Sequence, residues 1–181
     1  MRDIIFLIGY MGCGKTTLGE ALARRTGVRF VDLDDYIEVR AGMSIREIFA
    51  TKGEPEFRRM EREALAELST PVAHTTIVAC GGGTPCTPGN MELMNSVGLT
   101  VFLQTSVERL VSRLAVARDH RPLIAQLTDQ ELRLFVEHQL EARMPFYAKA
   151  AEVFDSTLLE DEAQVDQTSS SFIRQFLEYQ P

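Results

Sequence analysis

The stretch GYMGCGKTT, residues 9–17, lies between the apolar run IIFLI, residues 4–8, and a segment with helical periodicity that continues to Arg25. Its first eight residues have the spacing of a loop that cradles nucleotide phosphates: glycine, any four residues, then Gly-Lys-Thr. A chance match in a chain of this length is on the order of one in a hundred. The stretch therefore predicts a nucleotide site, with a buried strand before it and a helix after it.

The residues of this loop have separate expected roles. Its glycines let the backbone turn N–H groups inward, and the following helix adds the positive end of its dipole. Lys15 is expected to reach the outer phosphates, and the hydroxyl of Thr16 is expected to bind Mg²⁺. Asp32, at the end of the next strand, could reach the same metal through water, although a solvated acid is the alternative. The predicted contacts with ATP come from Gly12, Cys13, Gly14, Lys15, Thr16 and Thr17.

Length and composition restrict the class of protein. A chain of 181 residues suits one domain, expected to span residues 1–181, and its 45% apolar and 25% charged residues are typical of soluble proteins. No apolar run is long enough to cross a bilayer and no secretory signal is recognised, so a cytoplasmic location is expected. A net charge of −7 argues against a nucleic-acid partner. The three cysteines have no metal-binding spacing and are interpreted as reduced space-fillers.

Apolar segments and helical segments alternate along the rest of the chain. This alternation predicts an α/β fold, in which helices cover both faces of a parallel sheet. The loop at about residues 117–127 is polar at its tip and apolar at its end, as expected of a lid that closes over a site. Strands are expected at residues 4–8, 28–35, 75–80, 99–103 and 151–155, and helices at 15–25, 44–49, 55–68, 106–117, 128–143 and from 161 onward.

Two acids follow the second predicted strand in the sequence Asp32-Leu33-Asp34. The period of two along a strand would put both carboxylates on one side, with Asp34 one step beyond Asp32 and closer to an acceptor. A carboxylate suits a substrate hydroxyl, because it accepts the hydroxyl's hydrogen bond and could take its proton. Asp34 is therefore the candidate contact for an acceptor hydroxyl.

A predicted helix and a glycine run supply two further candidates. Arg58 and Glu61 fall one helical turn apart, so Glu61 could fix a guanidinium that binds a carboxylate bidentately. The neighbouring Arg59, Arg62 and Glu63 are interpreted as a solvated helix face. The glycines at 81–83 leave room for a ligand beside the backbone, with a plain turn as the alternative.

Together, these motifs resemble those of the shikimate kinases. The family signature has a phosphate loop, then DxD, then FRxxE, then GGG. This chain has the same motifs in the same order at residues 9–16, 32–34, 57–61 and 81–83. It also has Arg121-Pro122-Leu123, which is similar to the family's lid, and Arg143 followed by Tyr147. The resemblance covers nearly the whole chain.

The resemblance implies a fold and a reaction. The fold is a three-layer sandwich with a five-stranded parallel sheet, of the P-loop, nucleoside monophosphate kinase-like type with a lid loop. The reaction is the transfer of phosphate from ATP, with Mg²⁺, to the 3-hydroxyl of shikimate. This step gives shikimate 3-phosphate and ADP on the route to chorismate and the aromatic amino acids. The protein is expected to act as a monomer on these two small substrates.

The resemblance also implies roles for individual residues. Lys15, Asp34 and Arg121 are the expected catalytic residues, with Asp34 on the reacting hydroxyl and Arg121 closing over the phosphates. Arg113 is expected against the adenine, and Thr16 and Asp32 near the metal. The expected shikimate-binding residues are Asp34, Arg58, Glu61, Gly81, Gly82, Gly83 and Arg143, with the two arginines on the substrate's carboxylate.

Two departures and two alternatives accompany this hypothesis. Cys13 stands where the family commonly has Ala or Ser, and the segment DSTLLEDEA at 155–163 does not match the family's adenine loop, so the adenine contacts there stay unassigned. One alternative is another small-molecule kinase of this fold, such as a gluconate kinase, against which FRxxE, GGG and Arg143 argue. The other is a nucleotide sensor without activity, against which the joint presence of the catalytic residues argues.

Overall fold

A computed structural model of the chain describes residues 4–70, 74–118 and 123–178. Its centre is one parallel sheet with the strand order β2-β3-β1-β4-β5. Strands β1 and β3 are completely buried and lie inside the sheet, as the continuous apolar sequence of β1 predicts for that strand. The strands are β1 (Ile4–Ile8), β2 (Arg29–Asp32), β3 (Thr76–Ala79), β4 (Leu99–Gln104) and β5 (Glu152–Asp155).

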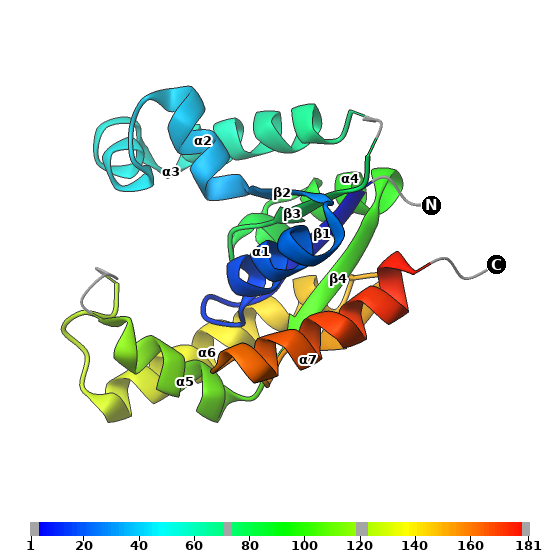
Figure 1. The fold of residues 1–181 in the computed structure, drawn as a ribbon. Helices are drawn as coiled ribbons and strands as arrows, with labels where there is room; N and C mark the ends of the chain where they lie inside the picture. The colour runs from blue at the N-terminus through cyan, green and yellow to red at the C-terminus, as the bar shows by residue number, and fades with distance from the viewer. Residues whose placement is uncertain (1–3, 71–73, 119–122, 179–181) are drawn as a thin grey trace.

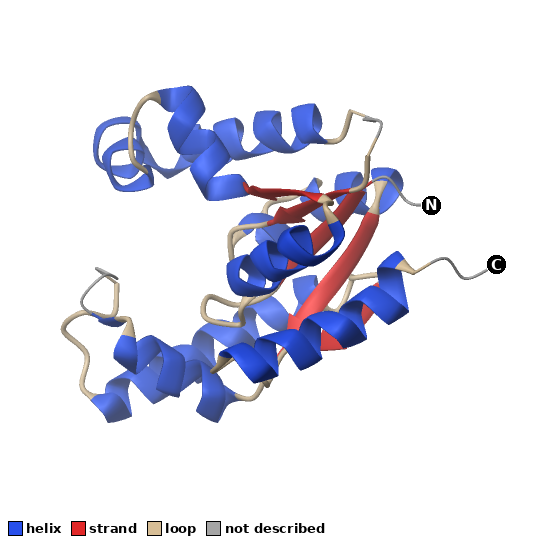
Figure 2. Ribbon diagram, viewed as in Figure 1, coloured by secondary structure: helices blue, strands red, loops and turns tan. Residues whose placement is uncertain are grey.

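Helices cover the sheet on both faces, so the expected three-layer α/β sandwich is confirmed (Figures 1 and 2). Helices α1 and α7 pack side by side on the face nearer the viewer, and α4 and α6 lie behind the sheet. Helices α2 and α3 lie beyond the β2 edge. The helices are α1 (Lys15–Thr26), α2 (Leu33–Ala41), α3 (Ile45–Leu68), α4 (Asn90–Val97), α5 (Val107–Val116), α6 (Asp129–Tyr147) and α7 (Glu162–Phe172), with short turns η1 (Thr84–Cys86) and η3 (Ile173–Leu177).

The strand register brings three functional segments to one edge of the sheet. Leu7 of β1 and Asp32 of β2 both pair with Ala79 of β3, so these three residues are level across neighbouring strands. Two residues beyond each of them come Gly9, Asp34 and Gly81. The carboxyl edge of a parallel sheet is where ligands bind in open α/β folds. The phosphate loop, the acid pair and the glycine run therefore meet there.

The structure corrects the second predicted strand, which ends at Asp32 instead of continuing to residue 35. The Asp32 carboxylate accepts a hydrogen bond from the Asp34 amide at 3.1 Å and caps the helix α2, which the sequence analysis did not predict. Asp34 is therefore on the first turn of a helix and not one step along a strand. The strand-period argument for its direction was wrong, although the residue still lies beside the glycine run.

Helix α4 was not predicted either, and the boundaries of two predicted segments also differ from the structure. The segment before Pro55 stays helical past Phe49 and breaks at Gly53, whose φ of 80° and ψ of 170° are not helical. Pro55 lies in the first turn after this break, as expected. Helix α6 passes through Pro145 and ends at Tyr147, one turn later than predicted. Within the described ranges, no helix is both long and apolar enough to cross a membrane.

Candidate active site

The phosphate loop has the backbone conformation that its glycines predict. Gly9, Gly12 and Gly14 have φ values of 145°, 82° and 97°, which side chains with a Cβ rarely adopt. Gly14 caps the start of α1, so the first amides of that helix face the loop. The Lys15 ammonium donates to the carbonyl oxygens of Gly9 at 2.8 Å and Tyr10 at 3.1 Å. The loop thus keeps a positive charge at the mouth of a dipole-lined anion site.

Thr16 and Asp32 lie in contact beside this loop. The Thr16 hydroxyl donates to the Asp32 carboxylate at 2.8 Å. One hydroxyl and one carboxylate fit Mg²⁺ in a nucleotide site, because that ion keeps several waters and takes its remaining ligands from phosphates. Within the described ranges no group of three or more acidic, His or Cys side chains could hold a metal by itself. The donor set suits a metal that arrives with the nucleotide.

Asp34 is a partly buried carboxylate among other acids. Its pKa is raised from 3.8 to about 6, chiefly by burial and then by the negative charges of Asp32 and Glu61, while the charge of Lys15 opposes this rise. A carboxyl with a pKa near 6 is mostly ionised at neutral pH, yet it holds a proton more readily than an ordinary aspartate. Asp34 therefore has the charge of a hydrogen-bond acceptor and the basicity of a proton acceptor.

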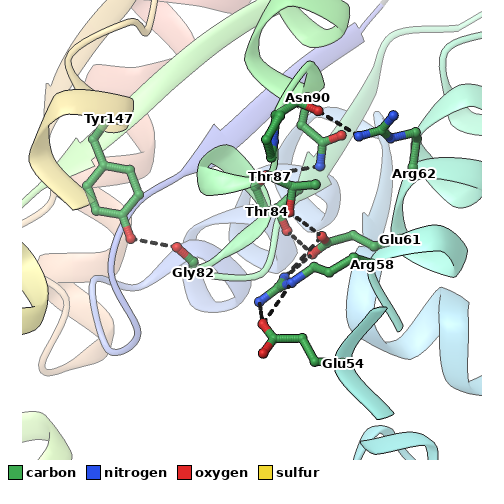
Figure 3. Close-up of polar contacts among 10 residues, drawn as sticks. Glu54, Arg58, Glu61, Arg62, Gly82, Thr84, Thr87, Asn90 and Tyr147 are labelled. Atoms are coloured by element: carbon green, nitrogen blue, oxygen red, sulfur yellow. Dashed lines mark hydrogen bonds and ion pairs between the residues drawn. The ribbon is translucent and has the colours of Figure 1, made fainter. Parts of the chain in front are cut away.

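The predicted pair of Arg58 and Glu61 is present on α3. The Arg58 Nη1 donates to both oxygens of Glu61 at 3.3 and 3.1 Å, and the Glu61 side chain is 1% exposed. The Thr84 hydroxyl donates to Glu61 at 2.6 Å (Figure 3). Glu54 contacts the Nε and Nη2 atoms of Arg58 from its exposed position. The guanidinium is thus held from one side by a buried carboxylate.

Each glycine of the run lies beside one of three side chains that are expected to bind the substrate. A Cβ at Gly81 would lie 3.1 Å from the Asp34 carboxylate, one at Gly82 would lie 3.2 Å from the Arg143 guanidinium, and one at Gly83 would lie 2.9 Å from the Arg58 guanidinium. A side chain at any of these three positions would therefore crowd the Asp34 carboxylate or one of the two guanidinium groups. The structure brings together Asp34, Arg58, Glu61, Arg143 and the three glycines.

Helix α6 contributes Arg143 and, one turn later, Tyr147. The Arg143 guanidinium lies over the Tyr10 ring at 5.4 Å and donates to Gln139 at 3.1 Å. The fully buried Tyr147 hydroxyl donates to the Gly82 carbonyl at 2.7 Å. Burial raises the pKa of Tyr147, so the hydroxyl keeps its proton at neutral pH.

A cavity of about 430 Å³ joins the nucleotide residues to the acceptor side. Its lining includes the predicted ATP residues except Cys13, whose buried side chain packs under the loop. Asp34 and the glycine run border its other end. The lining residues are Met11, Gly12, Gly14, Lys15, Thr16, Thr17, Asp32, Asp34, Cys80, Gly81, Gly82, Arg113, Leu114, Ala117, Leu159 and Glu160.

Arg113 connects this cavity to the segment that the sequence analysis left without assigned contacts. Its guanidinium donates to the carbonyls of Gly12 at 3.1 Å and Thr157 at 2.8 Å and pairs with Glu160 at 3.0 Å. Leu159 reaches over the loop, because a Cβ on Gly14 would lie 2.3 Å from its side chain. The segment at 155–163 therefore borders the nucleotide end of the cavity. Arg121, the expected lid residue, lies outside the described residues.

Sequence reasoning missed several residues of the site. Thr84 and Tyr147 hold other site residues through contacts distant in sequence, and Leu159 lines the cavity from after the last strand. Arg62 is exposed, as expected of a solvated helix face, and donates to the Pro88 carbonyl at 2.6 Å. Tyr147 was named with Arg143 in the family resemblance but was given no role, although its position one helical turn later puts it on the same face.

The fold and the site define a class of protein. A phosphate loop between β1 and α1, an acid at the end of β2 and arginines across the same sheet edge are the parts of a P-loop kinase for a small anionic acceptor. The family model described as shikimate kinase matches residues 11–175. The chain belongs to the shikimate kinase family.

Individual relatives agree with this assignment. The chain is 46% identical to a shikimate kinase of Phocaeicola vulgatus over 92% of this chain and 94% of that protein. It is 42% identical to a shikimate kinase of Parabacteroides distasonis over 94% of this chain and 97% of that protein. The crystal structure of a shikimate kinase from Bacteroides thetaiotaomicron superposes with a TM-score of 0.90 at 42% identity, covering 97% of this chain and 98% of that one. The solved structure of a shikimate kinase from Acinetobacter baumannii in complex with shikimate gives a TM-score of 0.80 at 31% identity, covering 98% of this chain and 94% of that one.

Proposed function

We propose that this protein transfers the γ-phosphoryl group of ATP to the 3-hydroxyl of shikimate, giving shikimate 3-phosphate and ADP on the route to the aromatic amino acids. The observation that carries the proposal is the meeting of Asp34, Arg58 and Arg143 around one glycine run at the end of the nucleotide cavity. An acceptor with one carboxylate and a ring of hydroxyls matches two guanidinium groups and one carboxylate. Membership of the shikimate kinase family supports the same acceptor.

At the acceptor end, Arg58 and Arg143 bind the substrate's carboxylate and Asp34 accepts a hydrogen bond from the reacting hydroxyl. Glu61 holds Arg58 in place, so less side-chain freedom is lost when the substrate binds. The bare amides of the glycine run let the ring approach the backbone closely. The acceptor oxygen is thereby positioned before any bond changes, which is the main requirement of phosphoryl transfer.

At the donor end, the loop amides and Lys15 bind the phosphates, and Arg113 with Leu159 borders the adenosine. Thr16 and, through water, Asp32 would hold Mg²⁺, which neutralises charge on the phosphate oxygens when bound. Lys15 must leave the carbonyls of Gly9 and Tyr10 to reach the phosphates. Arg121 is assigned to the closing lid from the family resemblance alone.

Asp34 completes the step by receiving the hydroxyl's proton. Its pKa near 6 makes it a better base than an ordinary aspartate, while it stays ionised at pH 7. The transfer forms a bond between the acceptor oxygen and phosphorus and breaks the bond to the bridging oxygen of ADP. No covalent enzyme intermediate is needed.

We also propose that the chain works as a single domain and a monomer in the cytoplasm. The expectation of one domain spanning residues 1–181 rests on its length, and that of a monomer on the family resemblance. Size-exclusion chromatography with light scattering tests the monomer, for which a mass near 20.3 kDa is expected.

The experiment that tests the proposed function is an ADP-release assay with Mg²⁺-ATP and a panel of acceptors. Shikimate should support turnover well above the acceptor-free rate, whereas gluconate and nucleoside monophosphates should not. Turnover with gluconate alone would assign the chain to another small-molecule kinase. ATP binding without any acceptor-dependent ADP release would indicate a nucleotide sensor.

A further inference from the structure

The three carbonyls of the glycine run all have hydrogen-bond donors. The amide of Thr84 donates to Gly81 at 3.0 Å, and the amide of Cys86 donates to Gly83 at 2.9 Å. Both donors lie in η1, which follows directly. The middle carbonyl, that of Gly82, instead takes its hydrogen bond from Tyr147, which is 65 residues away on α6. The middle of the run is therefore held by a side chain from another layer of the fold.

The direction of this carbonyl determines the direction of the next amide. The described residues contain no cis peptide bond, so the Gly82 carbonyl and the Gly83 N–H point in opposite directions within one planar unit. Figure 3 shows Tyr147 and Arg58 on opposite sides of the loop segment that carries Gly82. The hydrogen bond from Tyr147 consequently turns the Gly83 amide away from α6, with the Gly83 Cα beside the Arg58 guanidinium. Among the described residues, this amide has no partner in the protein.

This peptide unit would rotate easily without that hydrogen bond. It is flanked by glycines on both sides, and glycine has no Cβ to oppose a change of φ and ψ. In the rotated state the Gly82 oxygen would face the Arg58 side of the run. It would then accept from the guanidinium and repel a substrate carboxylate, while the Gly83 amide would be lost as a donor.

We propose that Tyr147 is a positioning residue for the acceptor substrate, which it serves by fixing the peptide between Gly82 and Gly83. The inference deepens the proposed function and rests on it. The phenol is itself fixed: its ring stacks on Phe102 of β4 with a centroid distance of 5.2 Å and an interplanar angle of 22°. Arg143 lies one turn earlier on the same helix and packs against the same glycine. One face of α6 thus binds the substrate's carboxylate and orients the backbone beside it.

The test compares Tyr147→Phe with Tyr36→Phe. The first variant keeps the ring and its stacking and removes only the hydroxyl. The second removes a phenol hydroxyl that donates to Glu67 at 3.0 Å on the outer surface, so it serves as the matched control. Loss of one hydrogen bond should raise the shikimate KM of Tyr147→Phe by about three- to tenfold. The ATP KM should change by less than about twofold, because the nucleotide residues keep their contacts.

Two results would overturn the inference. One is a folded, active Tyr147→Phe whose shikimate KM equals that of the wild type. The other is an equal rise in both Michaelis constants, which indicates general loosening of the fold. A wild type without shikimate-dependent ADP release would instead contradict the proposed function. Should Tyr147→Phe fail to fold, the wild-type amide resonance of Gly83 provides the test: it should shift on titration with shikimate, and an unchanged resonance would reject the role.

Discussion

The carboxylate of Glu61 is buried beneath the Arg58 guanidinium and contacts it through both of its oxygens. Burying a carboxylate is costly unless hydrogen bonds and an opposite charge accompany it, and here the Thr84 hydroxyl supplies a further hydrogen bond at 2.6 Å. The arrangement fixes a cation beside the glycine run, and the exposed Glu54 contacts the Nε and Nη2 atoms on its other edge. An anion can therefore bind to a guanidinium that is already oriented.

The first prediction concerns Glu61→Gln. The amide keeps the shape but removes the charge that holds Arg58, so the shikimate KM should rise by about tenfold or more. The free energy of unfolding should fall by about 1–3 kcal/mol, because the buried hydrogen bonds are altered. Glu63→Gln on the same helix is the control, since Glu63 is exposed and pairs with Arg59. Urea unfolding and steady-state kinetics measure both effects. Equal behaviour of the two variants would show that Glu61 has no special role.

The second prediction concerns the two arginines. Arg58→Lys and Arg143→Lys keep the charge and lose the planar fork, so each should raise the shikimate KM by about tenfold or more with a much smaller effect on ATP. Arg59→Lys, a charge-matched change on the outer face of α3, should leave both constants unchanged.

A neutral amide analogue of shikimate tests the same contact from the ligand's side. It should be a poor substrate of the wild type, and its disadvantage relative to shikimate should shrink in Arg58→Ala and Arg143→Ala. An undiminished disadvantage in both variants would mean that the arginines do not bind the carboxylate.

The third prediction links Asp34 to stability and pH. Because its pKa is raised from 3.8 to about 6 in the folded protein, its stabilising contribution is present below pH 4 and is lost as the pH rises through 6. Ionised Asp34 therefore costs stability at neutral pH, by at most about 3 kcal/mol. Asp34→Asn should be more stable than the wild type at pH 8, nearly equal to it at pH 4, and almost inactive. Melting curves at the two pH values check this. A stability difference that does not vary with pH would contradict the burial of a charge there.

The same pKa predicts how the activity varies with pH. The deprotonated carboxylate is the acting form, so kcat/KM for shikimate should fall on the acid side with a midpoint at or below about pH 6. A bound metal would add positive charge and move the midpoint down from the value of the free protein, in which the charge of Lys15 already acts. An acid limb centred above pH 7 would exclude Asp34 as the titrating group.

The fourth prediction concerns Lys15→Met. The ammonium contacts loop carbonyls and faces the cavity, so its loss should abolish turnover while the melting temperature changes little. Lys149→Met, which removes an ammonium paired with Glu92 on the surface, is the control and should keep full activity. Near-normal turnover by a folded Lys15→Met variant would contradict the assignment of residues 9–16 as a phosphate-binding loop.

The sheet and the phosphate loop could be predicted from the sequence because their signals are local. Residues 4–8 form a continuous apolar run, residues 99–103 are apolar except for Thr100, and the loop motif fixes a strand before it and a helix after it. The second strand was predicted too long because Phe30, Asp32 and Asp34 keep a formal period of two. The actual end is set by the Asp32 side chain, which caps the next helix. Residues 32–34 alone decide whether the strand continues or ends in a helix cap. A pattern read over a longer stretch of sequence cannot distinguish these two outcomes.

The predicted site residues were motif residues, whereas the missed ones act through contacts set by the fold. Thr84 reaches Glu61 across 23 positions and Tyr147 reaches Gly82 across 65, and neither distance follows from local patterns. Leu159 lies over Gly14 only because β5 ends next to β4 and returns the chain to the phosphate loop. Thr84 and Leu159 carry no motif of their own, and Tyr147 entered only through the family resemblance, without an assigned role.

The most direct test of the proposed activity is identification of the product. The purified protein is incubated with Mg²⁺-ATP and shikimate, and the phosphorylated product is examined by phosphorus–proton correlation NMR. The proposed function predicts equimolar ADP and one phosphate ester whose phosphorus couples to the proton at carbon 3 of the ring. An ester at another hydroxyl, or ADP formed without any shikimate ester, would contradict it.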